Sequence, residues 1–165
     1  MVAFEDDFED EDELDNLELL FDDDDLDYEM PTYEQLTEMY NIFKQDIIRN
    51  PPIIKGVPLT HNKDKSKHRD FRNLPDGFVH CITRKSEHSG NRSFDKERAQ
   101  KIHWIKPIIE NIKNSKIKYF EAINDKGENQ LFYWYESKQF IVIIREMNPN
   151  LLLITTFHVD KNNKT

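Results

Sequence analysis

Four apolar runs with short connections occupy residues 116–158. They read "KIKYFEAI", "NQLFYWYE", "QFIVIIRE" and "NLLLITTFH", and they are joined by "NDKG", "SK" and "MNP". Aromatic and β-branched residues dominate the runs, which is typical of β-strands. Connections this short join neighbouring strands that run in opposite directions. The sequence therefore predicts an antiparallel meander over this part of the chain.

Helical patterns precede the meander. Residues 32–50 have helical apolar spacing, with Thr32 as N-cap and Gln35 at the capping-box position, and Pro51 ends the helix. A second helix begins near Ser93 or Asp95, and Pro107 kinks or splits it. Residues 77–83 alternate like a strand. We therefore expect an α+β fold, with one or more N-terminal helices packed on an antiparallel sheet of four or five strands.

Charge divides the chain unevenly. Residues 1–30 hold 16 Asp and Glu and no Lys or Arg, which leaves 16 acids against all 23 Lys and Arg, a net charge of +7 for the remainder. This division predicts an acidic disordered tail over 1–30, a leading helix over 31–50, a mobile linker over 51–75, a main domain over 76–160 and a disordered C-terminus over 161–165. Apolar residues are spaced among the acids of the tail. The tail is therefore either a docking segment for a basic, partly apolar surface or a solubilising extension.

Cysteine content and hydropathy indicate the cellular compartment in which the protein is expected. Cys81 is the single cysteine, which predicts a fold without disulfides in a reducing cytosol. The N-terminus lacks the pattern of a secretory signal, and no apolar run approaches the length of a membrane span. These features predict a cytoplasmic protein with no membrane partner.

Several kinds of site are missing from the sequence. It has no zinc-ligand spacing, no nucleotide-binding fingerprint and no acidic pair suited to two-metal catalysis, so we expect no metal and no cofactor. Residues 82–118 carry 10 bases and 4 acids, enough to attract a phosphate backbone. Aromatic residues follow closely, and unpaired RNA bases stack on such rings.

RNA cleavage without a metal needs a proton acceptor, a proton donor and cations near the phosphate. Histidine suits either proton role. The candidate catalytic residues are His80, His88 and His158, and the alternative for each is a purely structural or solvent-facing role. The candidate phosphate- and RNA-binding residues are Arg84, Lys85, Arg98, Arg145, Thr155 and Thr156. For Arg98 and Arg145 the alternatives are a salt bridge from helix to sheet and simple solvent exposure.

One stretch resembles a known family. "FDKERAQKIHWIKPIIEN", residues 94–111, followed by strands ending in "LLLITTFH", resembles phage- and prophage-associated domains of the barnase–EndoU–colicin–RelE-like (BECR) nuclease superfamily. The resemblance covers about residues 76–160. It implies a compact endoribonuclease that needs no metal, acts as a toxin or in phage–host conflict, and cleaves RNA by attack of the 2′-hydroxyl. It also implies site roles for His80, Arg84, His88, Arg98 and Thr155 or Thr156.

Two classes of function follow. The first is this ribonuclease, acting on single-stranded RNA or tRNA, restrained by its own acidic tail or by a protein inhibitor. The second is a non-catalytic interaction protein, either an acidic mimic of nucleic acid that engages a basic partner or a regulator that binds RNA without cutting it.

Overall fold

The computed structural model describes residues 12–159. The first 11 residues of the acidic tail, and the predicted disordered C-terminus over 161–165, lie outside the described residues. None of the helices within 12–159 is long and apolar enough to cross a bilayer.

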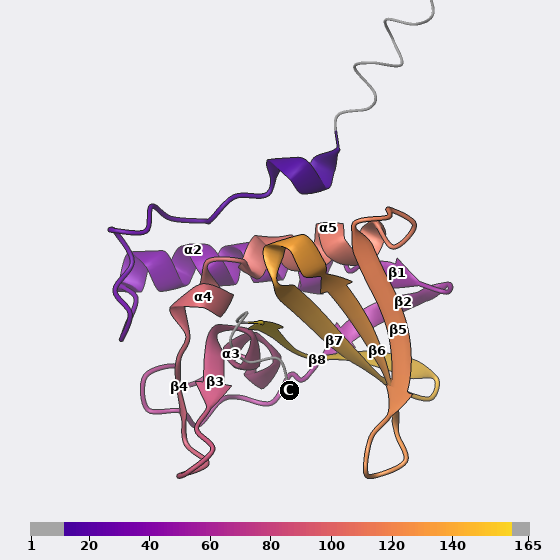
Figure 1. Cartoon of the computed structure of the whole chain (residues 1–165). Helices are drawn as coiled ribbons and strands as arrows, with labels where there is room; N and C mark the ends of the chain where they lie inside the picture. The colour runs from indigo at the N-terminus through magenta and orange to yellow at the C-terminus, as the bar shows by residue number, and fades with distance from the viewer. Residues whose placement is uncertain (1–11, 160–165) are drawn as a thin grey trace, which may run out of the picture.

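The fold is α+β, built on a six-stranded mixed sheet (Figure 1). The predicted meander is confirmed by β5 (Ile117–Ile123), β6 (Asn129–Tyr135), β7 (Phe140–Met147) and β8 (Asn150–His158), which pair antiparallel in chain order. The sheet continues beyond β8, since β2 (Val57–His61) pairs with it in parallel and β1 (Ile53–Ile54) pairs with β2. The expectation of a purely antiparallel sheet of four or five strands was therefore wrong.

The leading helix is confirmed. Helix α2 spans Tyr33–Phe43 and continues as a π-helix over Lys44–Arg49. Thr32 caps it as predicted, because its hydroxyl accepts from the Gln35 backbone N–H at 3.1 Å and the Gln35 side chain accepts from the Thr32 N–H at 2.9 Å. Helix α2 lies along the same side of the sheet as α5 (Ile105–Glu110), and Met39 and Phe43 are fully buried there (Figure 1).

The strand expected over 77–83 is a helix, α3 (Asp76–Ile82). Its apolar residues are buried on all sides, and the periodicity of so short a run does not distinguish a helix from a strand. Gly77 fits the tight approach of α3 to the end of β2. A Cβ at this position would lie 3.0 Å from the backbone nitrogen of Asn62. His80 is therefore held by a helix, and not by a strand.

The second predicted helix is broken into short pieces. Helix α4 (Lys96–Ala99) is followed by a 3₁₀ turn over Ile102–Trp104 and then by α5. Pro107 does not cause the break, because it lies in the first turn of α5. Backbone N–H groups in the first turn of a helix have no partner within the helix, so proline is tolerated there. Just before α4, a two-stranded hairpin is formed by β3 (Thr83–Lys85) and β4 (Arg92–Phe94).

Residues 51–75 are not a loose linker. They contain β1 and β2, followed by a loop that anchors itself in the core through Phe71, which is 1% exposed. Within this loop the backbone N–H of Ser66 donates to Leu74 O at 2.8 Å, and the N–H of Asn73 donates to Ser66 O at 3.0 Å. The loop is therefore ordered by its own backbone bonds and by one aromatic anchor.

The described part of the acidic tail, residues 12–30, forms an ordered strap across the helical side of the molecule (Figure 1). Leu14 and Leu26 are buried in the main core. The Trp104 indole N–H donates to Glu18 O at 2.9 Å, and the buried Lys96 ammonium donates to Asp23 O at 2.6 Å. The prediction of a disordered tail is wrong for residues 12–30, because their apolar residues pack on the core and their backbone is bonded to the body.

Candidate active site in the pocket of His80

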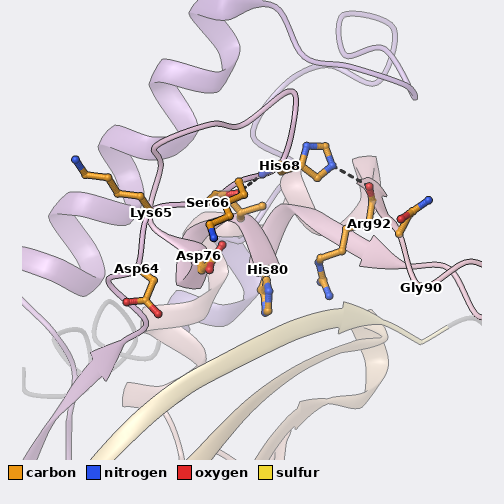
Figure 2. A pocket seen from close by; sticks show the side chains of 11 residues that line it. Asp64, Lys65, Ser66, His68, Asp76, His80, Gly90 and Arg92 are labelled. Atoms are coloured by element: carbon orange, nitrogen blue, oxygen red, sulfur yellow. Dashed lines mark hydrogen bonds between the residues drawn. The ribbon is translucent and has the colours of Figure 1, made fainter.

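A pocket of about 730 Å³ lies between the loop after β2, helix α3 and the start of β4. Figure 2 shows His80 and Arg92 pointing in the same direction, with Asp76 close to His80. Charged and polar groups dominate the lining, which consists of Asp64, Lys65, Ser66, Lys67, His68, Asp76, Val79, His80, Gly90, Asn91 and Arg92. The pocket thus combines a histidine with several cations.

His80 is half-buried on α3. Burial, followed by the charge of Arg92, lowers the pKa of its imidazole below the ordinary value of 6.5, and the nearby Asp76 carboxylate partly opposes this. The imidazole is therefore neutral at pH 7 and able to accept a proton. Within the described part of the chain, neither ring nitrogen of His80 takes part in a hydrogen bond, so both remain available to a ligand.

Arg92 lies beside His80 at the start of β4. Its Nε–H donates to Thr83 Oγ1 at 2.8 Å and its Nη2 donates to Thr83 O at 3.1 Å. A guanidinium has five N–H groups, so these two bonds fix its direction and leave three for another acceptor. A positioned arginine of this kind suits a phosphate or carboxylate.

The loop residue His68 is a fixed part of the pocket wall. Its Nδ1 accepts from the Asp70 backbone N–H at 3.1 Å, so its Nε2–H donates to Arg92 O at 2.8 Å. Both ring nitrogens are occupied, and His68 therefore ties the loop to β4. Its neighbours Lys65 and Lys67 are exposed and place two positive charges at the pocket, beside the carboxylates of Asp64 and Asp76.

Three of the residues predicted from the sequence meet at this site. The Thr155 hydroxyl donates to His80 O at 2.9 Å, and Arg98 Nη1 donates to Thr155 Oγ1 at 3.3 Å. Arg98 also donates to Thr83 O at 2.6 Å and pairs with Asp95 at 3.2 Å. Arg98 and Thr155 therefore support the helix that carries His80, and neither side chain lines the pocket itself.

The other predicted residues lie elsewhere, and none of them lines this pocket. Arg84, Lys85 and His88 are exposed on the β3–β4 hairpin. His158 is bonded to Lys101 Nζ at 2.9 Å, and Arg145 lies 3.6 Å from Glu128. Thr156 is fully buried.

Sequence reasoning missed Arg92, Asp76 and the loop lysines. The run "HNKDKSKH", residues 61–68, is dense in cations and contains two histidines, but it was interpreted as a linker. Its charge density was the available signal. No sequence signal showed that this run folds back on α3, because that contact depends on the tertiary fit at Gly77.

The strap comes close to this site without entering it. A second pocket, of about 670 Å³, shares His68, Asn91 and Arg92 with the first and is lined by Glu29 and Met30 of the strap. No residue of 12–30 lines the His80 pocket. Inhibition of the activity by the acidic tail remains a prediction. Since no residue of 12–30 lines the pocket, residues 1–11 would have to inhibit it, and they lie outside the described residues.

Comparison with models of protein families, with curated proteins and with solved structures found no match. Between residues 12 and 159, no group of three or more His, Cys, Asp or Glu is arranged to hold a metal ion.

Proposed function

We propose that this protein is an endoribonuclease that needs no metal and cleaves RNA in the His80 pocket by attack of the 2′-hydroxyl. The main support for the proposal is the pairing of a neutral imidazole, to whose ring nitrogens no residue of 12–159 is hydrogen-bonded, with an arginine fixed beside it. The alternative for His80, a histidine hydrogen-bonded for a structural role, fits this geometry less well.

In the proposed reaction His80 takes the proton from the 2′-hydroxyl, and the 2′-oxygen forms a bond to phosphorus. The bond from phosphorus to the 5′-oxygen breaks, and that oxygen takes a proton from water. The products are a 2′,3′-cyclic phosphate and a 5′-hydroxyl end. Arg92 stabilises the charge that grows on the phosphate, since its remaining N–H groups are free to donate to phosphate oxygens.

Lys65 and Lys67 have a different role in this account. They are exposed at the pocket rim, so they attract and align the phosphate backbone without contacting the reacting atoms. Arg98 and Thr155 are positioning residues, because they act on His80 through its backbone carbonyl.

The test compares the full chain with His80→Ala and His88→Ala on end-labelled RNA in EDTA. The full chain is used because the strap contributes to the core. General base catalysis typically contributes 10²- to 10⁴-fold, so His80→Ala should slow cleavage by about that factor while His88→Ala, on the exposed hairpin, cleaves normally. Equal cleavage by all three would refute the role of His80. RNA binding without cleavage would favour a non-catalytic RNA-binding regulator.

A further inference from the structure

The face of the sheet opposite the main core carries a second apolar layer. Directly paired residues of neighbouring strands present their side chains on the same face. One such row runs Thr155, Ile143, Phe132, Phe120 from β8 to β5, and the next runs Phe157, Ile141, Trp134, Lys118. Ile141 and Ile143 are each 9% exposed and yet lie outside the main core cluster. We call these two rows the outer face.

Aromatic rings form the open part of the outer face. Phe120 and Phe132 stack with their ring centroids 4.8 Å apart and their planes within 3° of parallel. Phe120 is 44% exposed, on the free edge strand of the sheet. Trp134 is half-buried, and within residues 12–159 its indole N–H has no hydrogen-bond partner. The indole nitrogen itself is buried, so the feature that a flat heterocycle would complete is the exposed Phe120 ring, which extends the stack.

The open end of the outer face carries an exposed cation, Lys118, whereas Arg98 at the β8 end is engaged by Thr83, Thr155 and Asp95. Lys118 Nζ lies 5.6 Å from the centroid of the Trp134 ring, and Arg98 Cζ lies 6.0 Å from that of Phe157. Lys118 also pairs with Glu136, and Arg98 with Asp95. The strand positions of the two rows contain no Asp or Glu, and the chain beyond residue 30 carries a net charge of +7, with 23 Lys and Arg against 16 acids.

The β8 end of the outer face contacts the helix that carries His80. The first row begins at Thr155, whose hydroxyl is bonded to the backbone carbonyl of His80. Neighbouring strands are about 4.8 Å apart, so the row from β8 to β5 spans about 14 Å. Ile143 is 9% exposed, so the open part of the row is Phe132 and Phe120, and a single strand with its phosphate at Arg92 would reach these rings across this distance.

We propose that the outer face is a stacking platform for unpaired bases, and that single-stranded RNA is the substrate class of the His80 pocket. The choice of RNA as the ligand rests on the proposed function, whereas the platform itself is inferred from the aromatic rings of the outer face. Bases in a duplex are already stacked on one another, so a duplex leaves Phe120 and Trp134 uncovered.

The test measures binding of a fluorescent 2′-O-methyl 12-mer of mixed sequence to the full chain by anisotropy. This oligonucleotide has no free 2′-hydroxyl, so binding is observed without cleavage. Phe120→Ala should weaken binding at least about five-fold, the lower end for loss of one stacked base. Ile123→Ala is the matched control, because it is 66% exposed on the same strand and points to the opposite face. Circular dichroism of both variants checks the fold.

Trp134 supplies a second readout. A stacked base should quench its fluorescence, while Trp104, which is 3% exposed, stays shielded, so Trp134→Phe should abolish the quenching. Equal binding of the single strand by Phe120→Ala and the native chain, or equal binding of a duplex of the same sequence, would overturn the platform. Absence of binding would overturn it in favour of a protein partner for this face.

The outcomes separate this inference from the proposed function. Binding sensitive to Phe120, without cleavage of the matching RNA, would support the platform and refute the ribonuclease. Cleavage that depends on His80 but is unchanged by Phe120→Ala would support the ribonuclease and refute the platform.

Discussion

At the scale of single residues, the contrast between two arginines decides what the pocket can bind. Arg98 is held by Thr83, Thr155 and Asp95, so its charge serves the fold. Arg92 uses two of its N–H groups on Thr83 and points the remainder into the pocket. The sequence placed both in a basic stretch and could not separate them, because only tertiary contacts decide which guanidinium is already occupied.

Arg92→Lys tests this distinction. Lysine keeps the positive charge but lacks the planar guanidinium that can donate to Thr83 and to a phosphate at the same time. The rate of cleavage at low RNA concentration should therefore fall about ten-fold or more, the size expected for loss of a hydrogen bond to a charged group. Initial rates over a range of RNA concentrations measure it. Arg49→Lys, at the exposed end of the π-helix, is the control and should change nothing. Equal rates for both variants would remove Arg92 from the site.

Buried histidines predict a pH dependence of stability. Burial is the main cause that lowers the pKa of His61, His80 and His103 from 6.5. The unfolded chain therefore binds protons more readily than the folded chain, and stability should fall as the pH drops through 6.5. Thermal melts between pH 7.5 and 6 should show a falling midpoint. His80→Gln should flatten the slope. An unchanged slope in His80→Gln would contradict its burial as a neutral group.

At the scale of elements, strong local patterns predicted most of the structure. The capping box at Thr32 and the four strands of the meander were found from sequence because each has a repeated local signal. Helix α3 was misread because its seven residues are too short for periodicity to identify. The strap was misread because its acidic composition favours disorder, whereas five of its apolar side chains lie in the core or pack against it.

The strap gives a matched stability test. Leu14 is fully buried, whereas Leu19, five residues later, is 44% exposed. Leu14→Ala should cost about 2–5 kcal/mol of unfolding free energy, as for other buried leucines, and Leu19→Ala should stay within about 0.5 kcal/mol. Urea denaturation of the full chain measures both. Similar small losses in the two variants would show that the strap does not belong to the core.

At the scale of the whole molecule, the sheet separates two apolar layers with different roles. Helices α2 and α5 and the strap cover one face and build the main core. The outer face is left with half-exposed rings, and its β8 end contacts the helix of His80 through Thr155. The sequence predicted the α+β class and a basic body, but not the parallel pairing of β2 with β8, because that contact joins residues about 90 positions apart and has no local signal.

We propose above all that the His80 pocket cleaves RNA by attack of the 2′-hydroxyl. The most direct measurement incubates the full chain in EDTA with a labelled single-stranded RNA and with its 2′-O-methyl counterpart, and determines the end groups of any products. We predict that the RNA is cut to 2′,3′-cyclic phosphate and 5′-hydroxyl ends, and that the 2′-O-methyl strand stays intact. An uncut RNA, or cleavage of both strands alike, would contradict the claim.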